Sequence, residues 1–110
     1  MKNPSYKIIK LEDKDKYQRL INKDLGSFGL KSGHVILSPG ESVGEHTTGD
    51  REEIVVVIRG NGEAIVDKDN MLNIDQSSVL YIPPKMIHDI KNTGQEALEY
   101  IYVTSETFQK

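Results

Sequence analysis

The feature that most constrains the fold is a series of short apolar runs, separated by turn residues, between residues 28 and 103. The runs cover residues 34–37, 54–58, 64–66, 79–82, 87–90 and 98–103. No amphipathic helix of useful length lies between them, so parallel strands joined by helices are not expected. Strands this short, with turns about every ten residues, are typical of a small all-β barrel or sandwich.

Two local patterns refine this prediction. Asn61-Gly62 is the strongest hairpin signal, because both residue types tolerate the positive φ angles of a type I′ turn. It predicts that residues 53–59 and 63–67 pair as antiparallel neighbours. Residues 54–58 are apolar at every position, which predicts a strand that is covered on both faces, by another part of the barrel or by a partner copy.

Residues 1–26 differ from the rest and form a predicted N-terminal extension. The pattern predicts a strand over residues 6–11 and a short helix over residues 13–21, with Asp13 or Asp15 in its first turn. A chain of 110 residues allows one domain and little more. We therefore expect the extension and a barrel core over residues 28–103 to form a single domain, residues 1–110.

Composition narrows the expected partners and ligands. The net charge of −3 gives no electrostatic footprint for nucleic acid or for an anionic membrane. The sequence shows no secretory signal and no apolar stretch of the roughly 18 residues that span a bilayer, so we expect a cytoplasmic protein. The chain contains no cysteine, so any metal site must use histidine nitrogens and oxygen ligands.

Three side chains form a candidate metal site, namely His46, Glu53 and His88. By strand alternation His88 shares the core face with Ile90, and Glu53 shares it with Val55. A carboxylate and an imidazole in an apolar interior are costly unless they are paired or bind a metal. Two neutral imidazoles and one carboxylate suit divalent zinc, iron, manganese, nickel or cobalt, and leave coordination positions open for water or substrate.

The same residues allow a plainer interpretation, in which His88 is a core histidine that forms an ion pair with Glu53 and no metal binds. Glu52 competes with Glu53 for the ligand role, but the alternation favours Glu53 and turns Glu52 outward. The third histidine, His34, is expected to have a structural role. Three tyrosines on predicted strands are expected either to offer their hydroxyls to a cavity or to pack the barrel, namely Tyr81, Tyr100 and Tyr102.

The candidate residues lie in two stretches that resemble the motifs of the cupin superfamily, in particular its small single-domain proteins of the cupin 2 conserved-barrel type. Gly40-x5-His46-x-Thr48-x4-Glu53-x6-Gly60 resembles the first motif, G-x5-H-x-H-x3–4-E-x6-G, with one substitution. Pro83-x-Lys85-x2-His88-x3-Asn92 resembles the core of the second motif, P-x-G-x2-H-x3-N, also with one substitution. The likeness covers residues 28–103.

The resemblance implies a jelly-roll barrel, or double-stranded β-helix, with the metal ligands at its open mouth. It places His46, Glu53 and His88 in three of the four usual ligand positions. Thr48 occupies the fourth, which is normally histidine. A neutral hydroxyl is a poor ligand for a first-row metal, so we expect three protein ligands, with Thr48 at most holding a metal-bound water. Lys85 replaces the second-motif glycine, which predicts a strained backbone or a changed turn type.

Two classes of function are consistent with these residues. The first is a metal-dependent enzyme that acts on a small polar organic molecule by dioxygenase-like or isomerase-like chemistry at the 2-His-1-Glu site, although no catalytic acid or base can be assigned. The second is a non-catalytic module that binds a small ligand with a weakened or lost metal site, which the substitution at Thr48 favours. A transcription-factor sensor is not expected, since the chain has no room for a helix-turn-helix and no basic patch.

The expected assembly is a homodimer. The strand at residues 54–58 needs cover on its second face, and the family resemblance also implies a dimer. An exchanged N-terminal strand is expected to cover the outer face of the barrel.

Overall fold

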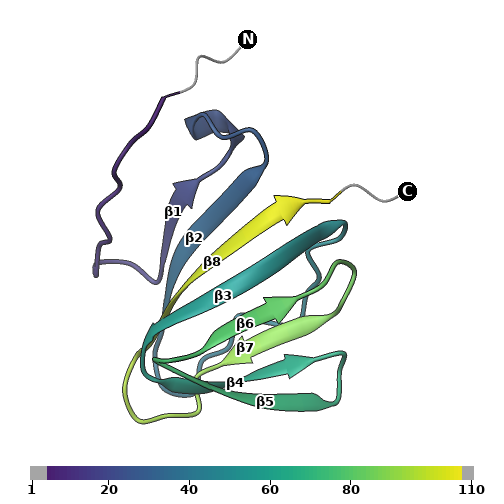
Figure 1. Ribbon diagram of the computed structural model, residues 1–110. Coiled ribbons are helices and arrows are strands. Elements are labelled where there is room, and N and C mark those ends of the chain that lie inside the picture. Colours follow the sequence, from purple (N-terminus) through teal and green to yellow (C-terminus); the bar gives the residue numbers. More distant parts are fainter. Residues whose placement is uncertain (1–4, 108–110) are drawn as a thin grey trace.

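The computed structural model describes residues 5–107, and its regular secondary structure is almost entirely antiparallel strands (Figure 1). The elements are β1 (Tyr17–Ile21), η1 (Lys23–Leu25, a single 3-10 turn), β2 (Leu30–Leu37), β3 (Arg51–Arg59), β4 (Asn61–Val66), β5 (Asn70–Asp75), β6 (Val79–Ile82), β7 (His88–Lys91) and β8 (Leu98–Glu106). The all-β fold expected from the sequence is confirmed. Each predicted run lies within or overlaps one of these strands.

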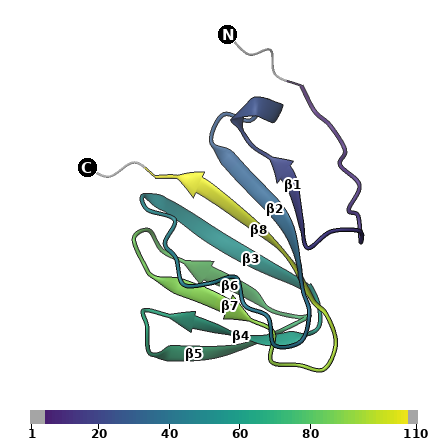
Figure 2. The same cartoon turned by 180° about the vertical axis from the view of Figure 1, so that it is seen from behind.

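The strands form two sheets that face each other (Figures 1 and 2). The five-stranded sheet has the order β1-β2-β8-β3-β6, and the three-stranded sheet has the order β5-β4-β7. The sheets converge where β3 ends and β8 begins, and they diverge toward the start of β3 (Figure 1). The barrel therefore has a closed end and an open end, and side chains of alternate residues point from each strand into the space between the sheets.

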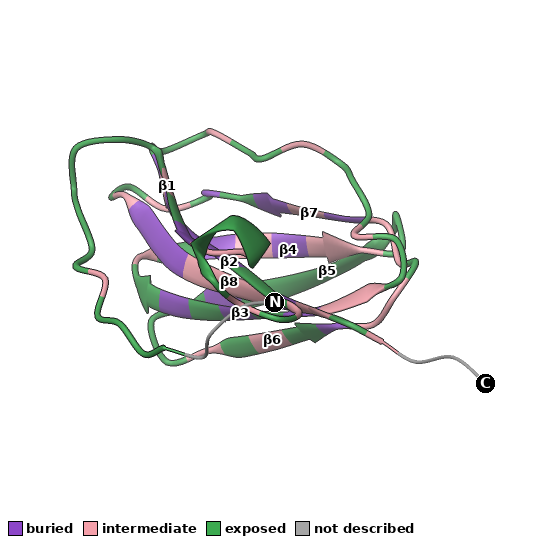
Figure 3. Cartoon of the chain, turned by 90° about the horizontal axis from the view of Figure 1, so that it is seen from above, coloured by how far each residue is buried: buried purple, intermediate pink, exposed green. Residues whose placement is uncertain are grey.

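Apolar side chains from both sheets fill that space. The buried cluster contains Val35, Leu37, Val55, Val57, Ala64, Ile74, Ile82, Ile90, Leu98 and Tyr100. At the closed end the fully buried Asn92 donates its Nδ2 hydrogens to the carbonyls of Leu37 at 2.9 Å and Glu96 at 2.8 Å. The buried stretches lie on strands, whereas the connecting loops are mostly exposed (Figure 3). The second-motif asparagine is thus a structural residue here.

The hairpin predicted at Asn61-Gly62 is wrong. β3 and β4 belong to different sheets, and both residues lie inside β4, where they pair with β5. The chain changes sheet at Gly60, whose φ is +88°. A Cβ at Gly60 would lie 2.3 Å from the Ala97 carbonyl oxygen, so only glycine fits this crossing.

The hairpin instead lies one strand later, between β4 and β5. Its loop has three residues, 67–69, between the paired Val66 and Asn70, and Asp67 and Lys68 there have φ angles of +55° and +72°, in the left-handed region that tight turns use. β5 was not among the predicted strands, because asparagines at positions 70 and 73 interrupt its apolar pattern.

The N-terminal extension also differs from the prediction. Residues 6–11 form no strand, and residues 17–21, expected in a helix, form β1, which pairs with the edge of β2. The helical part is only the single turn η1. Pairing with β2 satisfies the backbone groups of these residues, whereas a helix of this length is marginal in water. Within residues 5–107, no helix has the length and apolar character needed to cross a bilayer.

Residues 5–107 cover the second face of β3 only in part. Val55 and Val57 are buried between the sheets, but Ile54, Val56 and Ile58 on the other face are 39%, 36% and 38% exposed. The described part of the chain therefore does not fully cover this strand on both faces, and cover by a partner copy stays a prediction.

Candidate functional site

The open end of the barrel brings together His46, Glu53 and His88. One ligand atom from each residue lies within 4.8 Å of the other two. His46 comes from the loop before β3, Glu53 from β3 and His88 from the start of β7. Paired backbone hydrogen bonds of 2.9 Å and 2.8 Å join His46 to His88, and their ring centroids lie 4.3 Å apart. Glu53 reaches the two imidazoles from the opposite sheet.

Backbone carbonyls fix the tautomer of both histidines. His46 Nδ1 lies 2.7 Å from the Gly44 carbonyl oxygen, and His88 Nδ1 lies 3.0 Å from the Met86 carbonyl oxygen. A carbonyl oxygen can only accept a hydrogen bond, so each Nδ1 carries the proton. The Nε2 lone pairs are therefore available for another partner. This is the arrangement that histidines ligating a metal typically adopt.

His88 is the most constrained member of the cluster. Its side chain is 1% exposed, and its Nε2 has no hydrogen bond from any described residue. The nearest charge is Glu53 Oε1 at 3.4 Å, which is an ion-pair distance rather than a well-formed hydrogen bond. Burial alone would lower the pKa of His88, but Glu53 and the Met86 carbonyl outweigh it and raise the pKa above the ordinary value of 6.5.

The raised pKa of His88 predicts opposite pH effects on two properties. Without metal, the protonated form is favoured by folding, so this contribution to stability is complete below pH 6.5 and is lost as the pH rises through the folded-state pKa. A metal must displace that proton, so metal affinity rises with pH by up to about tenfold per unit below the pKa. Melting temperatures measured with EDTA or with Zn²⁺, at about pH 5.5 and about pH 8.5, should show a larger metal-induced increase at the higher pH. Equal increases at the two pH values would contradict this prediction.

Thr48 lies beside the cluster and lines the same cavity. Its hydroxyl donates a 2.8 Å hydrogen bond to the Arg51 carbonyl, so its proton is already used. Lys85 occupies the second-motif glycine position and has a φ of +64°. The sequence predicts a strained backbone or a changed turn type there, and the strained backbone is the one observed. Its ammonium lies 3.5 Å from Asp50 Oδ1, and Lys85 does not line the cavity.

The remaining sequence predictions are resolved by side-chain direction. Glu53 is buried, whereas Glu52 faces outward and accepts a 2.9 Å hydrogen bond from Tyr81, as the alternation predicted. His34 lies outside the cavity, 1% exposed, with its Nε2 2.6 Å from Glu99 Oε2. Burial alone would raise the pKa of Glu99, but its bonds to Arg59 and His34 lower it. His34 is therefore part of a hydrogen-bonded network with Glu99 and Arg59, which is a structural role.

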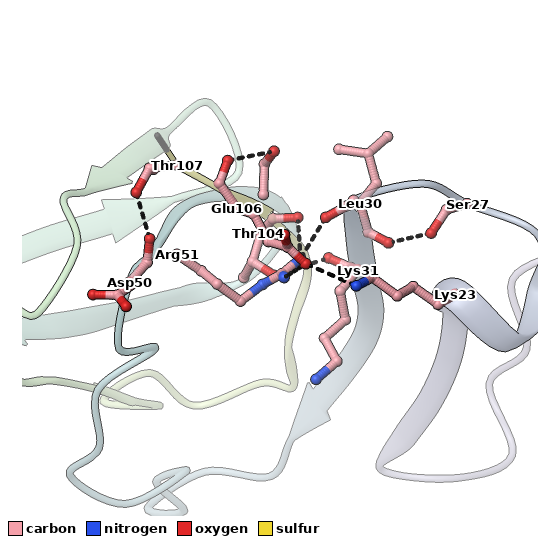
Figure 4. Close-up of polar contacts among 11 residues, drawn as sticks. Lys23, Ser27, Leu30, Lys31, Asp50, Arg51, Thr104, Glu106 and Thr107 are labelled. Atoms are coloured by element: carbon pink, nitrogen blue, oxygen red, sulfur yellow. Dashed lines mark hydrogen bonds and ion pairs between the residues drawn. The ribbon is translucent and has the colours of Figure 1, made fainter. Parts of the chain in front are cut away.

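A cavity of about 590 Å³ surrounds the cluster, large enough for a small organic molecule. Its walls include Tyr100 and Tyr102 of β8 and apolar residues of both sheets. The sequence prediction missed further lining residues, among them Tyr17, Lys31 and Arg51. Arg51 donates from Nε to Thr104 Oγ1 at 2.8 Å and from a terminal nitrogen to the Gly29 carbonyl at 2.5 Å (Figure 4). These bonds join β3 to β8 and to the residue before β2. The signal for Lys31 and Arg51 was their parity with Val35 and Glu53 on the same strands.

Comparison with known proteins identifies the family. The sequence profile of the family described as "Cupin domain" matches residues 33–104, well over half of the 110 residues. The chain belongs to the cupin family. Cupins commonly bind a metal, and the matched residues of this cupin include the His46, Glu53 and His88 cluster.

Solved cupin structures have the same fold. A cupin family protein from Methanocaldococcus jannaschii, described as RmlC-like with a double-stranded β-helix fold, superposes with a TM-score of 0.79 at 18% identity, covering 92% of this chain and 91% of that one. A protein from Thermotoga maritima, described as a predicted oxalate decarboxylase, superposes with a TM-score of 0.76 at 25% identity, covering 83% of this chain and 79% of that one. The double-stranded β-helix barrel is thereby confirmed.

One curated relative matches part of the cupin chain. The alginate biosynthesis protein AlgA of Pseudomonas putida is 30% identical over 83 residues, which cover 76% of this chain. The match spans 16% of AlgA, so this chain corresponds to a small part of that protein.

Proposed function

We propose that this cupin binds one divalent transition metal through His46, Glu53 and His88 and acts on a small polar organic molecule at that ion. Zinc, iron, manganese, nickel and cobalt all suit two imidazoles and one carboxylate. Three protein ligands leave coordination positions for oxygen atoms of the molecule. Isomerase-like or dioxygenase-like chemistry is the class of reaction that fits such a site.

The observation that supports the proposal most strongly is the unsatisfied Nε2 of His88. It is buried, points toward Glu53 and has no hydrogen-bond partner among residues 5–107. A buried nitrogen without a partner costs roughly 1–3 kcal/mol, a cost that coordination of a metal removes. The carbonyls of Gly44 and Met86 bind Nδ1 of both imidazoles and leave both Nε2 atoms for another partner, and one ligand atom from each of the three residues lies within 4.8 Å of the other two.

The protein side chains would have separate roles in the reaction. A bound metal would polarise a carbonyl or enediol oxygen of the molecule or, if it is iron, allow chemistry with dioxygen. Glu53 and the two histidines hold the ion. The apolar and aromatic cavity walls would pack against the carbon atoms of the molecule.

Metal analysis of protein purified without chelator tests the proposal directly. We expect close to one metal per chain, and turnover of at least one compound from a panel of small diketones, flavonols, keto sugars and oxalate. Oxalate is included because of the description of the Thermotoga maritima protein. Protein that takes up no metal when titrated with each of the five candidate ions would overturn the proposal.

A non-catalytic binding module is the second candidate, and Thr48 is the observation that favours it. A neutral hydroxyl is a poor ligand for a first-row metal, so Thr48 does not replace the fourth histidine of the motif as a strong ligand. Compounds that bind to the metal-loaded protein but are recovered unchanged would support this candidate over an enzyme.

We further propose that two copies associate through the outer face of the five-stranded sheet. Ile54, Val56 and Ile58 expose a continuous apolar row there. Tyr6 and Ile8, in the N-terminal segment that runs beside β1, are 100% and 87% exposed and are available to cover the same face of a second copy (Figure 2).

Light scattering at micromolar concentration should therefore give twice the 12.4 kDa chain mass. The double variant Ile54→Lys, Val56→Lys should be a monomer, because two charges in an apolar interface are unpaired. Met71→Lys changes an exposed apolar residue on the other sheet and should remain a dimer. A monomeric wild-type protein would contradict the dimer.

A further inference from the structure

The cavity around the His46, Glu53 and His88 cluster is positive, although the chain as a whole carries a net charge of −3. Three cationic side chains line it, namely Lys16, Lys31 and Arg51. Glu53 is the only carboxylate among its described lining residues, and its charge would be neutralised by a metal. The positive charge of the cavity therefore favours an anionic ligand.

Only one of the three cations lacks a partner within residues 5–107. Lys16 forms an ion pair with Glu41, and Arg51 bonds to Thr104 and to the Gly29 carbonyl. The Lys31 ammonium has no hydrogen bond or ion pair in that part of the chain, and its side chain leads away from the Arg51 contacts (Figure 4). Lys31 is thus the cation that remains to bind an anion.

Strand register places Lys31 at a defined distance from the cluster. Lys31 pairs with Thr104 across β2 and β8, and Thr104 pairs with Glu53 across β8 and β3. Adjacent strands lie about 4.8 Å apart, so the Cα atoms of Lys31 and Glu53 are about 10 Å apart on the same face of the sheet. A ligand of four to six carbons is long enough to reach from the cluster to the Lys31 side chain.

Two tyrosines beside Lys31 supply a second hydrogen-bond donor. The hydroxyl oxygens of Tyr17 and Tyr102 lie 2.7 Å apart, and their ring centroids lie 6.4 Å apart. Both rings pack closely against Gly33. A Cβ at Gly33 would lie 2.6 Å from the Tyr102 ring, so glycine is required beneath the pair. Two hydroxyls share one mutual hydrogen bond and leave one proton to donate outward. Burial raises the pKa of Tyr102, which keeps its hydroxyl protonated.

We propose that the molecule bound in this cavity carries a carboxylate that Lys31 and the Tyr17–Tyr102 hydroxyl pair hold, while oxygen atoms at its other end face His46, Glu53 and His88. A single ammonium matches a carboxylate, whereas a phosphate dianion requires more cationic donors. The inference rests on the proposed function, since it assumes a metal in the cluster. It makes Lys31 a specificity-determining residue rather than a catalytic one.

The test compares pairs of compounds with the same metal-binding end. Oxaloacetate, 2-oxoglutarate and 2-oxoadipate each have a 2-oxo acid end and a distal carboxylate. 2-Oxobutanoate, 2-oxopentanoate and 2-oxohexanoate have the same chain lengths without it. Calorimetric titration of Zn²⁺-loaded protein should show that at least one diacid binds about tenfold more tightly than its monoacid, a typical effect of one hydrogen bond to a charged group.

In Lys31→Gln that preference should fall to nearly onefold, while the affinity for the monoacid and the metal content stay unchanged. Lys91→Gln, which changes an exposed lysine of β7 outside the cavity, should keep the preference. Metal loading without any diacid preference, or a preference that survives Lys31→Gln, overturns the inference and leaves the proposed function intact. Failure of wild-type protein to bind metal, measured in the same samples, overturns the proposed function instead.

Discussion

Replacing His88 with alanine is expected to lower the affinity for a divalent transition metal by at least about 100-fold, more than the 10–100-fold that loss of an outer-shell partner costs. The reason is that His88 Nε2 is the buried nitrogen of the cluster and has no other partner among residues 5–107. Its loss leaves only two candidate ligands, Glu53 and the exposed His46, which together bind a divalent metal weakly. Titration of the metal-free protein with Zn²⁺ in the presence of a competing chelator measures the effect.

Two glutamates provide the matched control. Glu53→Gln removes the charge on the face of the cluster and should also weaken metal binding strongly, whereas Glu52→Gln changes the adjacent, outward-facing carboxylate and should not. Equal metal affinity in Glu53→Gln and Glu52→Gln would show that the carboxylate is not a ligand. Unchanged affinity in His88→Ala would exclude the site altogether.

The second large effect is expected at Gly60. Gly60→Ala should destabilise the fold by more than about 3 kcal/mol, because the new Cβ would meet backbone that cannot yield easily. The Cβ of an alanine at this position would lie 2.3 Å from the Ala97 carbonyl oxygen and 2.9 Å from the Leu98 Cα. The backbone φ of +88° is also unfavourable for any residue with a Cβ. For a domain of this size each kcal/mol lowers the melting temperature by roughly 4–8 °C, so a decrease of more than about 12 °C is expected.

Gly40→Ala separates strain from collision. Gly40 has a similar φ of +85°, but its Cβ would have open space around it. It should therefore lose only about 1–2 kcal/mol, the cost of the left-handed backbone alone. Denaturant unfolding of both variants measures the difference. Similar losses at the two positions would show that the contact with Ala97 contributes nothing.

Most of the fold could be predicted because alternation along a strand is a local property. Val55 and Val57 face the core and Glu52 faces water, and these positions follow from parity alone. The same rule oriented Glu53 and His88, and His46 was already in the candidate ligand set before the family motif placed all three residues in ligand positions. Sequence reasoning therefore identified the members of the cluster, whereas their mutual distances depend on how the two sheets approach each other.

The errors share a physical cause, which is competition between local signals and pairing at a distance. Asn61-Gly62 has the composition of a turn, but Gly62 is needed in β4 because a Cβ there would lie 2.4 Å from the Lys91 carbonyl oxygen. Residues 17–21 have helical spacing, but the open edge of β2 offers them a ladder of hydrogen bonds. Neither partner is close in sequence, so no window of a few residues contains the information.

The position of the cluster between the two sheets has a mechanical consequence. Glu53 belongs to the five-stranded sheet, and His88, with His46 bonded to it, belongs to the three-stranded side. At the closed end the sheets are joined by packed side chains and Asn92, but at the mouth the cavity leaves them without such packing. An ion held by all three ligands would therefore link the two sheets at the open end. Loss of the metal would remove this link between the two sheets.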